Sequence, residues 1–120
     1  MTKVTINEVG LRDGLQIQPK IVPLEGKIEL AQALVDSGIS SFEAASFVSP
    51  KAVPQMADAV EVFKNLPAKD KTYYSALLFN EKGYERAINA GAKSIAVALA
   101  STDKMNQANI RVSLEEATST

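Results

Sequence analysis

Residues 33–42 read ALVDSGISSF, and residues 87–95 repeat the pattern in weaker form as AINAGAKSI. Each copy contains the end of an apolar-striped helix, a glycine, two or three linking residues and the start of a strand. Glycine often ends a helix, because it adopts the left-handed backbone conformation needed there. The repeat therefore predicts that helices and strands alternate along the chain.

Working outward from this repeat, we predict four strands and four helices. Residues 4–9 alternate apolar and polar side chains, as in a strand with one buried face. Residues 41–47 and 72–79 are the next two strands, and the nearly continuous apolar run at 93–99 is typical of a strand buried on both faces. Three helices are expected at residues 24–37, 57–65 and 81–90, and Ser113 with Glu116 forms a capping box that begins a fourth. The segments 10–23 and 48–55, which contain proline, are expected to be loops.

Strict alternation of these elements predicts an α/β fold with parallel strands and right-handed crossovers. Residues 1–120 contain no linker and no low-complexity stretch, so we expect one unit. We further expect this unit to be cut off within its fourth helix, since only about two turns follow Ser113. The alternative is a complete, non-catalytic binding module of the flavodoxin-like kind, although a fifth strand is missing for that fold.

Composition excludes several classes of function. The chain has 13 basic and 14 acidic residues and a net charge of −1, which argues against a nucleic-acid partner. Without cysteine it can form neither disulfides nor a thiolate metal site. Without histidine it lacks the commonest general base and transition-metal ligand. Chemistry on this chain must therefore use carboxylates, arginine, lysine, tyrosine, amides or the backbone.

The expected cellular location follows from two features that the sequence lacks, a signal peptide and a membrane-spanning segment. Residues 1–10 have neither the basic start nor the apolar run of a signal peptide. No segment approaches the roughly 18 apolar residues of a membrane-spanning helix. We therefore expect a cytoplasmic protein without a membrane partner.

Polar residues gather where the predicted strands end, which is where parallel α/β folds place their chemistry. Asp13 offers the hard oxygen that Mg²⁺ or Mn²⁺ prefers, and Arg12 offers a fixed positive charge for a developing oxyanion. Glu43 is a carboxylate in an apolar strand, a costly position unless it is paired, and Arg12 is its natural partner one strand away. Gln16 follows in the same first loop.

Three further residues are candidates for binding substrate. Ser46 and Lys51 follow the second strand, Asn80 follows the third, and the Lys51 ammonium could meet an anionic substrate. Each residue also has a plainer interpretation. Arg12 and Asp13 could be an ordinary solvated turn, Glu43 could face a helix, and Lys51 could be a solvated loop residue.

The motifs at the strand ends resemble those of the 3-hydroxy-3-methylglutaryl-CoA (HMG-CoA) lyase family. The resemblance covers nearly the whole chain and rests on EVGLRDGLQ at 8–16, FEAASFVSPK at 42–51, VPQM at 53–56, NEKGYERA at 80–87, AGAK at 90–93, Asn109-Ile110 and SLEE at 113–116. The stretch SFVSPK is specific to the lyases, whereas RDG-x-Q is shared with related Claisen synthases. Two departures are Leu11, where the lyases commonly have proline, and the pair Ala44-Ala45, where they usually have threonine or valine-threonine.

This resemblance implies a (β/α)₈ TIM barrel of which the chain holds about the first four βα units, a half barrel. It implies cleavage of an acyl-CoA substrate, HMG-CoA, to acetoacetate and acetyl-CoA with a divalent metal ion, Mg²⁺ or Mn²⁺. Asp13 would be a metal ligand, Arg12 would stabilise the enolate, Glu43 would hold Arg12, and Gln16 would lie nearby as a third catalytic residue. The remaining metal ligands would lie beyond residue 120, so the chain alone is expected to be inactive.

A Claisen-type acyl-CoA synthase of the same barrel group is the alternative enzyme, and the lyase-type stretch from Ser46 to Lys51 counts against it. We also expect a homo-oligomer, because half a barrel leaves strand edges unpaired.

Overall fold

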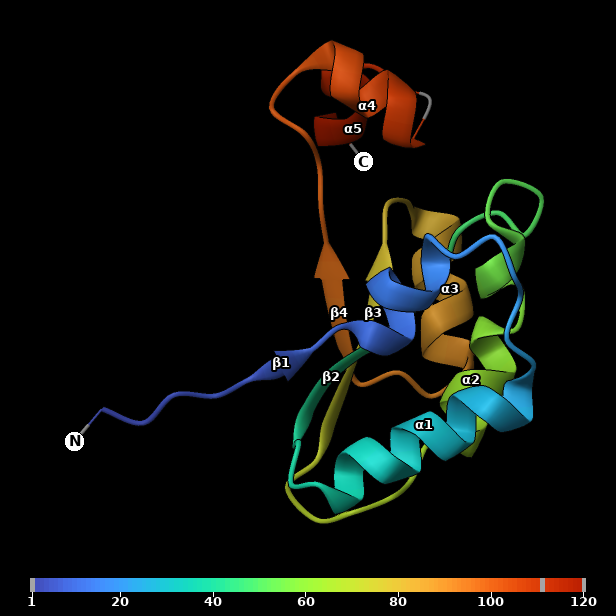
Figure 1. Cartoon of the computed structure of the whole chain (residues 1–120). Coiled ribbons are helices and arrows are strands. Elements are labelled where there is room, and N and C mark those ends of the chain that lie inside the picture. Colours follow the sequence, from blue (N-terminus) through green and yellow to red (C-terminus); the bar gives the residue numbers. More distant parts are fainter. Residues whose placement is uncertain (1, 111, 120) are drawn as a thin grey trace.

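Four parallel strands form one sheet in the order β1-β2-β3-β4 (Figure 1). The computed structural model describes residues 2–110 and 112–119, and for residues 109 and 110 only the backbone. The strands are β1 (Asn7–Glu8), β2 (Ser41–Ser46), β3 (Tyr73–Leu78) and β4 (Ser94–Val97). Helices α1 (Leu24–Asp36), α2 (Ala59–Asn65) and α3 (Glu81–Asn89) connect them. The predicted alternation and the parallel sheet are confirmed.

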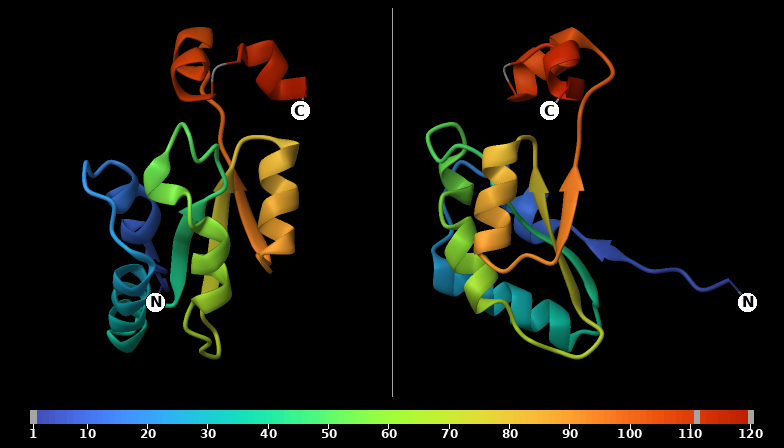
Figure 2. Two further views of the ribbon diagram at one scale, coloured as in Figure 1. Left: turned by 90° about the vertical axis from the view of Figure 1, so that its right-hand side faces the viewer. Right: turned by 180° about the vertical axis from the view of Figure 1, so that it is seen from behind.

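The three connecting helices lie side by side over one face of the sheet (Figure 2). Two apolar clusters fill this interface. One joins α1 to the first strands and includes Ala31, Val35 and Phe42, and the Phe42 ring stacks on Tyr74 with centroids 5.2 Å apart. The other lies under α2 and α3 and is built mainly from small side chains and Phe47. In the described part of the chain, no helix covers the opposite face of the sheet.

The predicted glycine repeat is confirmed at both of its copies. Gly38 follows α1 with φ of 100°, and Gly91 follows α3 with φ of 90°. Only glycine adopts these angles without strain, so each helix ends in the left-handed turn that leads into the next strand.

A bulge in β2 decides which of its side chains face the helices. The register with β3 shifts between Glu43 and Ala45. Phe42, Ala45 and Phe47 are therefore all buried toward the helices, although strict alternation would separate them. Because of the same shift, the Glu43 and Ser46 side chains lie on the side of β2 that faces away from the helices.

The two outer strands differ from the prediction. The first strand was expected over residues 4–9, but only Asn7 and Glu8 pair with β2, and Val4 and Ile6 are exposed. The last was expected to be buried on both faces, yet β4 has β3 as its only neighbour among the described residues, and 64% of Val97 is exposed. Both strands lie at a sheet edge, where an apolar pattern lacks the neighbour that would bury it.

Five helical segments also differ from the prediction. The loop after β1 begins with a π-helical turn, η1 (Gly10–Gly14), and a 3₁₀ turn, η2 (Pro54–Met56), precedes α2, which starts two residues later than expected. The helix α4 (Asp103–Ile110) was not predicted. The predicted capping box is confirmed, with Ser113 Oγ accepting from the Glu116 amide at 3.2 Å, but it begins a fifth helix, α5 (Leu114–Ser119).

Helices α4 and α5 lie beyond the carboxyl end of β4 (Figure 1). The buried Asn106 fixes α4 to the chain leaving β4: its amide oxygen accepts from the Ala100 amide at 2.8 Å, and its amide nitrogen donates to the Ala100 carbonyl at 2.9 Å. The two helices are joined where the Leu114 amide donates to the Asp103 carboxylate at 2.6 Å.

Candidate active site

The η1 turn presents Arg12 and Asp13 at the carboxyl edge of the sheet. The Asp13 and Gly14 amides both donate to the Val9 carbonyl, at 2.7 and 3.3 Å, which closes the turn. Leu11 points into the core, where it is buried against α1 and β2. This apolar anchor fixes the residue that follows it, so Arg12 leaves the turn in a defined direction.

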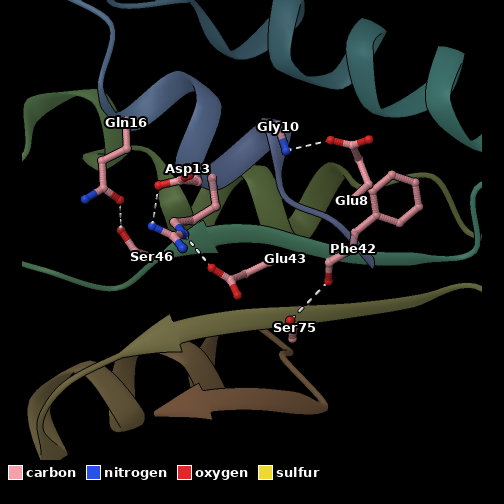
Figure 3. Close-up of polar contacts among 9 residues, drawn as sticks. Glu8, Gly10, Asp13, Gln16, Phe42, Glu43, Ser46 and Ser75 are labelled. Carbon is pink, nitrogen blue, oxygen red and sulfur yellow. Dashed lines mark hydrogen bonds and ion pairs between the residues drawn. The ribbon is translucent and has the colours of Figure 1, made fainter. Parts of the chain in front are cut away.

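Arg12 lies between two carboxylates. Its Nε donates to Glu43 Oε1 on β2, and its Nη1 donates to Asp13 Oδ1 at 3.2 Å (Figure 3). The exposed fractions of the side chains are 18% for Arg12, 12% for Glu43 and 56% for Asp13. The predicted Arg12–Glu43 pair is confirmed, and it satisfies a carboxylate that would be costly to bury alone.

Gln16 and Ser46 form a second contact at this edge. The Ser46 hydroxyl donates to Gln16 Oε1 at 3.1 Å, and the two side chains point toward each other in Figure 3. Ser46 is completely buried. The structure thus places Ser46 as support for Gln16, and direct contact of Ser46 with substrate stays a prediction.

A cleft of about 500 Å³ opens beside these contacts. Its polar lining comes from the segments that follow β1, β2 and β3, and consists of Arg12, Gln16, Ser49, Lys51 and Asn80. Its apolar lining consists of Phe47, Val48, Ala52, Val53, Leu77 and Phe79. Clefts of this size that combine apolar walls with a few polar groups are the usual form of small-molecule sites. Of the seven predicted site residues, Arg12, Gln16, Lys51 and Asn80 line this cleft.

The other three predicted residues lie outside the cleft wall. Glu43 and Ser46 hold Arg12 and Gln16, while Asp13 contacts the Arg12 guanidinium at Nη1. Asn80 has a second task, since its side-chain oxygen caps α3 by accepting from the Gly83 amide at 2.8 Å. Its Nδ2 is the group left for a ligand.

Asp13 is suited to be one ligand of a hard divalent cation, because its carboxylate is more than half exposed. Over residues 2–110 and 112–119, however, no three carboxylates, histidines or cysteines come together as a metal cluster. Asp13 therefore fits such an ion as one ligand, and no cluster of three surrounds it among the described residues.

Sequence reasoning missed two cations, Lys27 and Arg86, that contact the segment between β2 and α2, which lines this cleft. Lys27 is buried and contacts Gln55 and Asp58. A signal was present: positions 27, 31 and 35 are four apart and share the buried face of α1. For Arg86, which reaches Val48 from α3, the sequence held no comparable signal.

Parallel strands, crossover helices on one face and polar residues at the carboxyl edge define an α/β half-barrel with an enzyme-like site. Comparison with known families gives a match to the HMGL-like family over residues 3–120, and the chain belongs to that family.

Relatives and solved structures agree with this assignment. The chain is 44% identical over 114 residues to the mitochondrial hydroxymethylglutaryl-CoA lyase of Homo sapiens and 41% identical to the 3-hydroxy-3-isohexenylglutaryl-CoA/hydroxymethylglutaryl-CoA lyase of Pseudomonas aeruginosa, covering 95% of this chain in each case. An HMG-CoA lyase from Acinetobacter baumannii, solved with coenzyme A and 3-methylmalate, superposes with a TM-score of 0.93 at 38% identity over 99% of this chain.

The chain spans 35% and 38% of the lengths of those two relatives and 40% of that solved structure. The predicted half-barrel and the family resemblance are confirmed, and both disfavour a flavodoxin-like module. These relatives are named lyases, which favours the lyase over the synthase. No helix within the described ranges is long and apolar enough to cross a membrane. Because some relatives are named mitochondrial, the cytoplasmic location stays a prediction.

Proposed function

We propose that the chain forms the first four βα units of a metal-dependent carbon–carbon lyase that cleaves HMG-CoA to acetoacetate and acetyl-CoA. The observation that carries this proposal is the Arg12 guanidinium, held by Glu43 and Asp13 at the edge of a cleft at the strand ends. A cation fixed by two carboxylates is preorganised for a substrate oxyanion, and it needs no rearrangement as negative charge develops.

In the proposed reaction the 3-hydroxyl loses its proton to a base and becomes a carbonyl as the bond between C2 and C3 breaks. The electron pair of that bond moves into the thioester, and Arg12 donates to the enolate oxygen that forms. The protonated base then returns its proton to C2, which gives acetyl-CoA. Gln16 and Asn80 orient the acyl group from the cleft wall, and Lys51 meets an anionic part of the acyl-CoA. A divalent cation, Mg²⁺ or Mn²⁺, held in part by Asp13, would polarise the substrate oxygens as a Lewis acid.

The test uses a hybrid enzyme, in which residues 1–120 replace the matching segment of the Pseudomonas aeruginosa lyase, 40% identical and structurally similar with a TM-score of 0.89. We expect the hybrid to release acetyl-CoA from HMG-CoA, to lose activity with a chelator and to regain it with Mg²⁺ or Mn²⁺. The 120-residue chain alone should show no turnover, since it offers one metal ligand.

Asp13→Asn keeps the shape of the side chain and removes its charge. In the hybrid it should raise the Mg²⁺ concentration needed for half-maximal rate by about 10- to 100-fold or more, as for loss of a metal-site group. A folded hybrid without turnover would contradict the proposed function. Turnover by the isolated chain that Asp13→Ala abolishes would contradict the half-site argument.

A further inference from the structure

The segment between Phe47 and Gln55, here called the 47–55 loop, forms one wall of the cleft and carries Ser49 and Lys51. At its start the Phe47 amide donates to the Leu77 carbonyl of β3 at 2.8 Å, and within the loop the Ala52 and Val53 amides both donate to the Ser49 carbonyl at 3.0 Å. The first bond joins only residue 47 to the sheet, and the other two shape the tip of the loop, so these bonds do not fix residues 48–55 relative to the rest of the molecule.

Lys27 fixes the C-terminal end of the loop, at Gln55. Its ammonium, on α1, donates to the Gln55 carbonyl and to Asp58 Oδ1, each at 2.6 Å, and only 3% of the side chain is exposed. Gln55 in turn donates through Nε2 to the Gln18 carbonyl at 2.7 Å, so this end of the loop is also joined to the segment after η1.

Arg86, on α3, contacts the start of the loop. From α3, its Nη1 donates to the Val48 carbonyl at 3.0 Å, and its guanidinium lies over the Phe47 ring, 5.7 Å from the centroid. Two cations from different helices therefore donate to backbone carbonyls at opposite ends of the same loop.

A purely structural role does not account for Lys27. A buried ion pair contributes little net stability compared with apolar residues of similar size, because removing two charges from water is costly. Apolar contacts with Ala31 and Val35, its neighbours on the buried face of α1, would serve the core equally well. What an apolar residue cannot provide is a directed hydrogen bond to the Gln55 carbonyl.

We propose that Lys27 and Arg86 are positioning residues that hold the 47–55 loop in place, so that Lys51 and Ser49 face the bound acyl-CoA. The nature of this ligand rests on the proposed function. The positioning of the loop does not. Because Arg12 and Asp13 belong to η1, loosening the 47–55 loop should weaken substrate binding more than it slows bond cleavage.

The first measurement is amide hydrogen exchange, which needs no activity. Lys27→Met keeps the length and apolar stem of the side chain, and Asp58 can turn to water, since it is partly exposed. In the hybrid we expect the Ala52, Val53 and Met56 amides to exchange about 10-fold faster or more, while the Tyr73 amide, bonded within the sheet, keeps its rate. Arg86→Met should accelerate Ala52 and Val53 more than Met56.

Lys64→Met is the matched control. Lys64 also forms an ion pair with an acidic residue of α2, Glu61, but at 3.8 Å and with both side chains more than half exposed. Its removal should leave loop exchange unchanged. The same comparison on the 120-residue chain makes the result independent of how well the hybrid folds.

The second measurement is steady-state kinetics of the hybrid. Lys27→Met and Arg86→Met should each raise KM by about 10-fold or more with kcat changed less than about 3-fold, and Lys27→Arg should restore part of the KM. Loop exchange that stays at the wild-type rate in both variants would overturn the proposal, and so would a normal KM in folded variants. If the parent hybrid is inactive, the proposed function fails, while the exchange data still decide whether the loop is held.

Discussion

At the scale of single residues, the site depends on how Arg12 is held. Glu43 contacts its Nε and Asp13 contacts Nη1, so the guanidinium is restrained from two sides. The sequence predicted the first contact, because adjacent parallel strands bring their carboxyl ends together. It could not predict the π-helical turn, since that turn depends on burying Leu11 against residues of α1 and β2.

The first prediction follows from this geometry. Arg12→Gln in the hybrid removes the charge that we propose stabilises the enolate but retains a hydrogen-bond donor. We expect kcat to fall by roughly 10²–10³-fold with KM little changed, as for loss of one oxyanion donor. Initial-rate kinetics measure both constants. Lys82→Gln, on the exposed first turn of α3, is the control and should behave as the parent. A raised KM with normal kcat would show that Arg12 only holds substrate.

The second prediction concerns alkaline pH. Burial raises the pKa of Tyr74 above its ordinary value of 10.0, because the phenolate would be desolvated, and its hydroxyl donates to the Pro67 carbonyl at 2.6 Å. The folded state therefore keeps this proton more tightly than the unfolded state. The stabilisation is complete below pH 10 and is lost as pH rises through the folded-state pKa.

Tyr74→Phe tests this prediction. At neutral pH the variant should be less stable by about 1 kcal/mol, the usual value of one hydrogen bond. Above pH 10 its free energy of unfolding should converge with that of the parent, as measured by urea unfolding at several pH values. Tyr73→Phe, at an exposed position, is the control. A difference that stays constant with pH would refute the assignment.

At the scale of elements, the sequence predicted what local chemistry determines. Gly38 and Gly91 end helices wherever those helices pack, and the capping box of Ser113 and Glu116 is formed within its own segment of the chain. The length of β1 and the exposure of β4 depend instead on which strands lie beside them. The spacing of residues 27, 31 and 35 could have placed Lys27 on the buried face of α1, but it could not identify its partner, the Gln55 carbonyl, 28 residues away.

The third prediction tests how closely α3 packs on the carboxyl end of β2. A Cβ added at Gly83 would lie 2.6 Å from the Phe47 carbonyl oxygen and 3.3 Å from Leu78 Cβ. Alanine gains about 1 kcal/mol over glycine in helix propensity. The clash with a backbone atom outweighs this gain, so Gly83→Ala should destabilise the chain by about 1–3 kcal/mol in urea unfolding.

Gly14→Ala is the control for this change, because its added Cβ meets nothing within 4 Å. It should leave the free energy of unfolding nearly unchanged. Equal effects of the two substitutions would indicate that α3 shifts freely over the loop, contrary to the close packing seen here.

At the scale of the whole molecule, the sheet formed by the described residues has two open edges and one face that none of their helices covers (Figure 2). Ile95, Val97 and Leu99 at the β4 edge are all exposed apolar residues. Exposed edge strands pair with other chains, and burying apolar area contributes roughly 25 cal/mol per Å². A chain with these features is expected to associate.

The fourth prediction is that the isolated chain forms dimers or larger assemblies in sedimentation velocity, with a thermal midpoint that rises with protein concentration. Val97→Lys places a charge on the exposed β4 edge and should shift the distribution toward monomer. A monodisperse monomer with a sharp, concentration-independent transition would contradict it.

Leu11 connects the core to the chemistry, since it is buried against Ala31 and Val35 of α1 while its neighbour Arg12 points into the cleft. Any change in side-chain volume on that face of α1 is passed on to the guanidinium through one peptide unit. Laboratory selection for altered reaction rate should therefore enrich substitutions within α1, a helix that contributes none of the residues lining the cleft in the described structure. For this enzyme family, libraries that randomise only cleft residues would leave an accessible route to new activity unexplored.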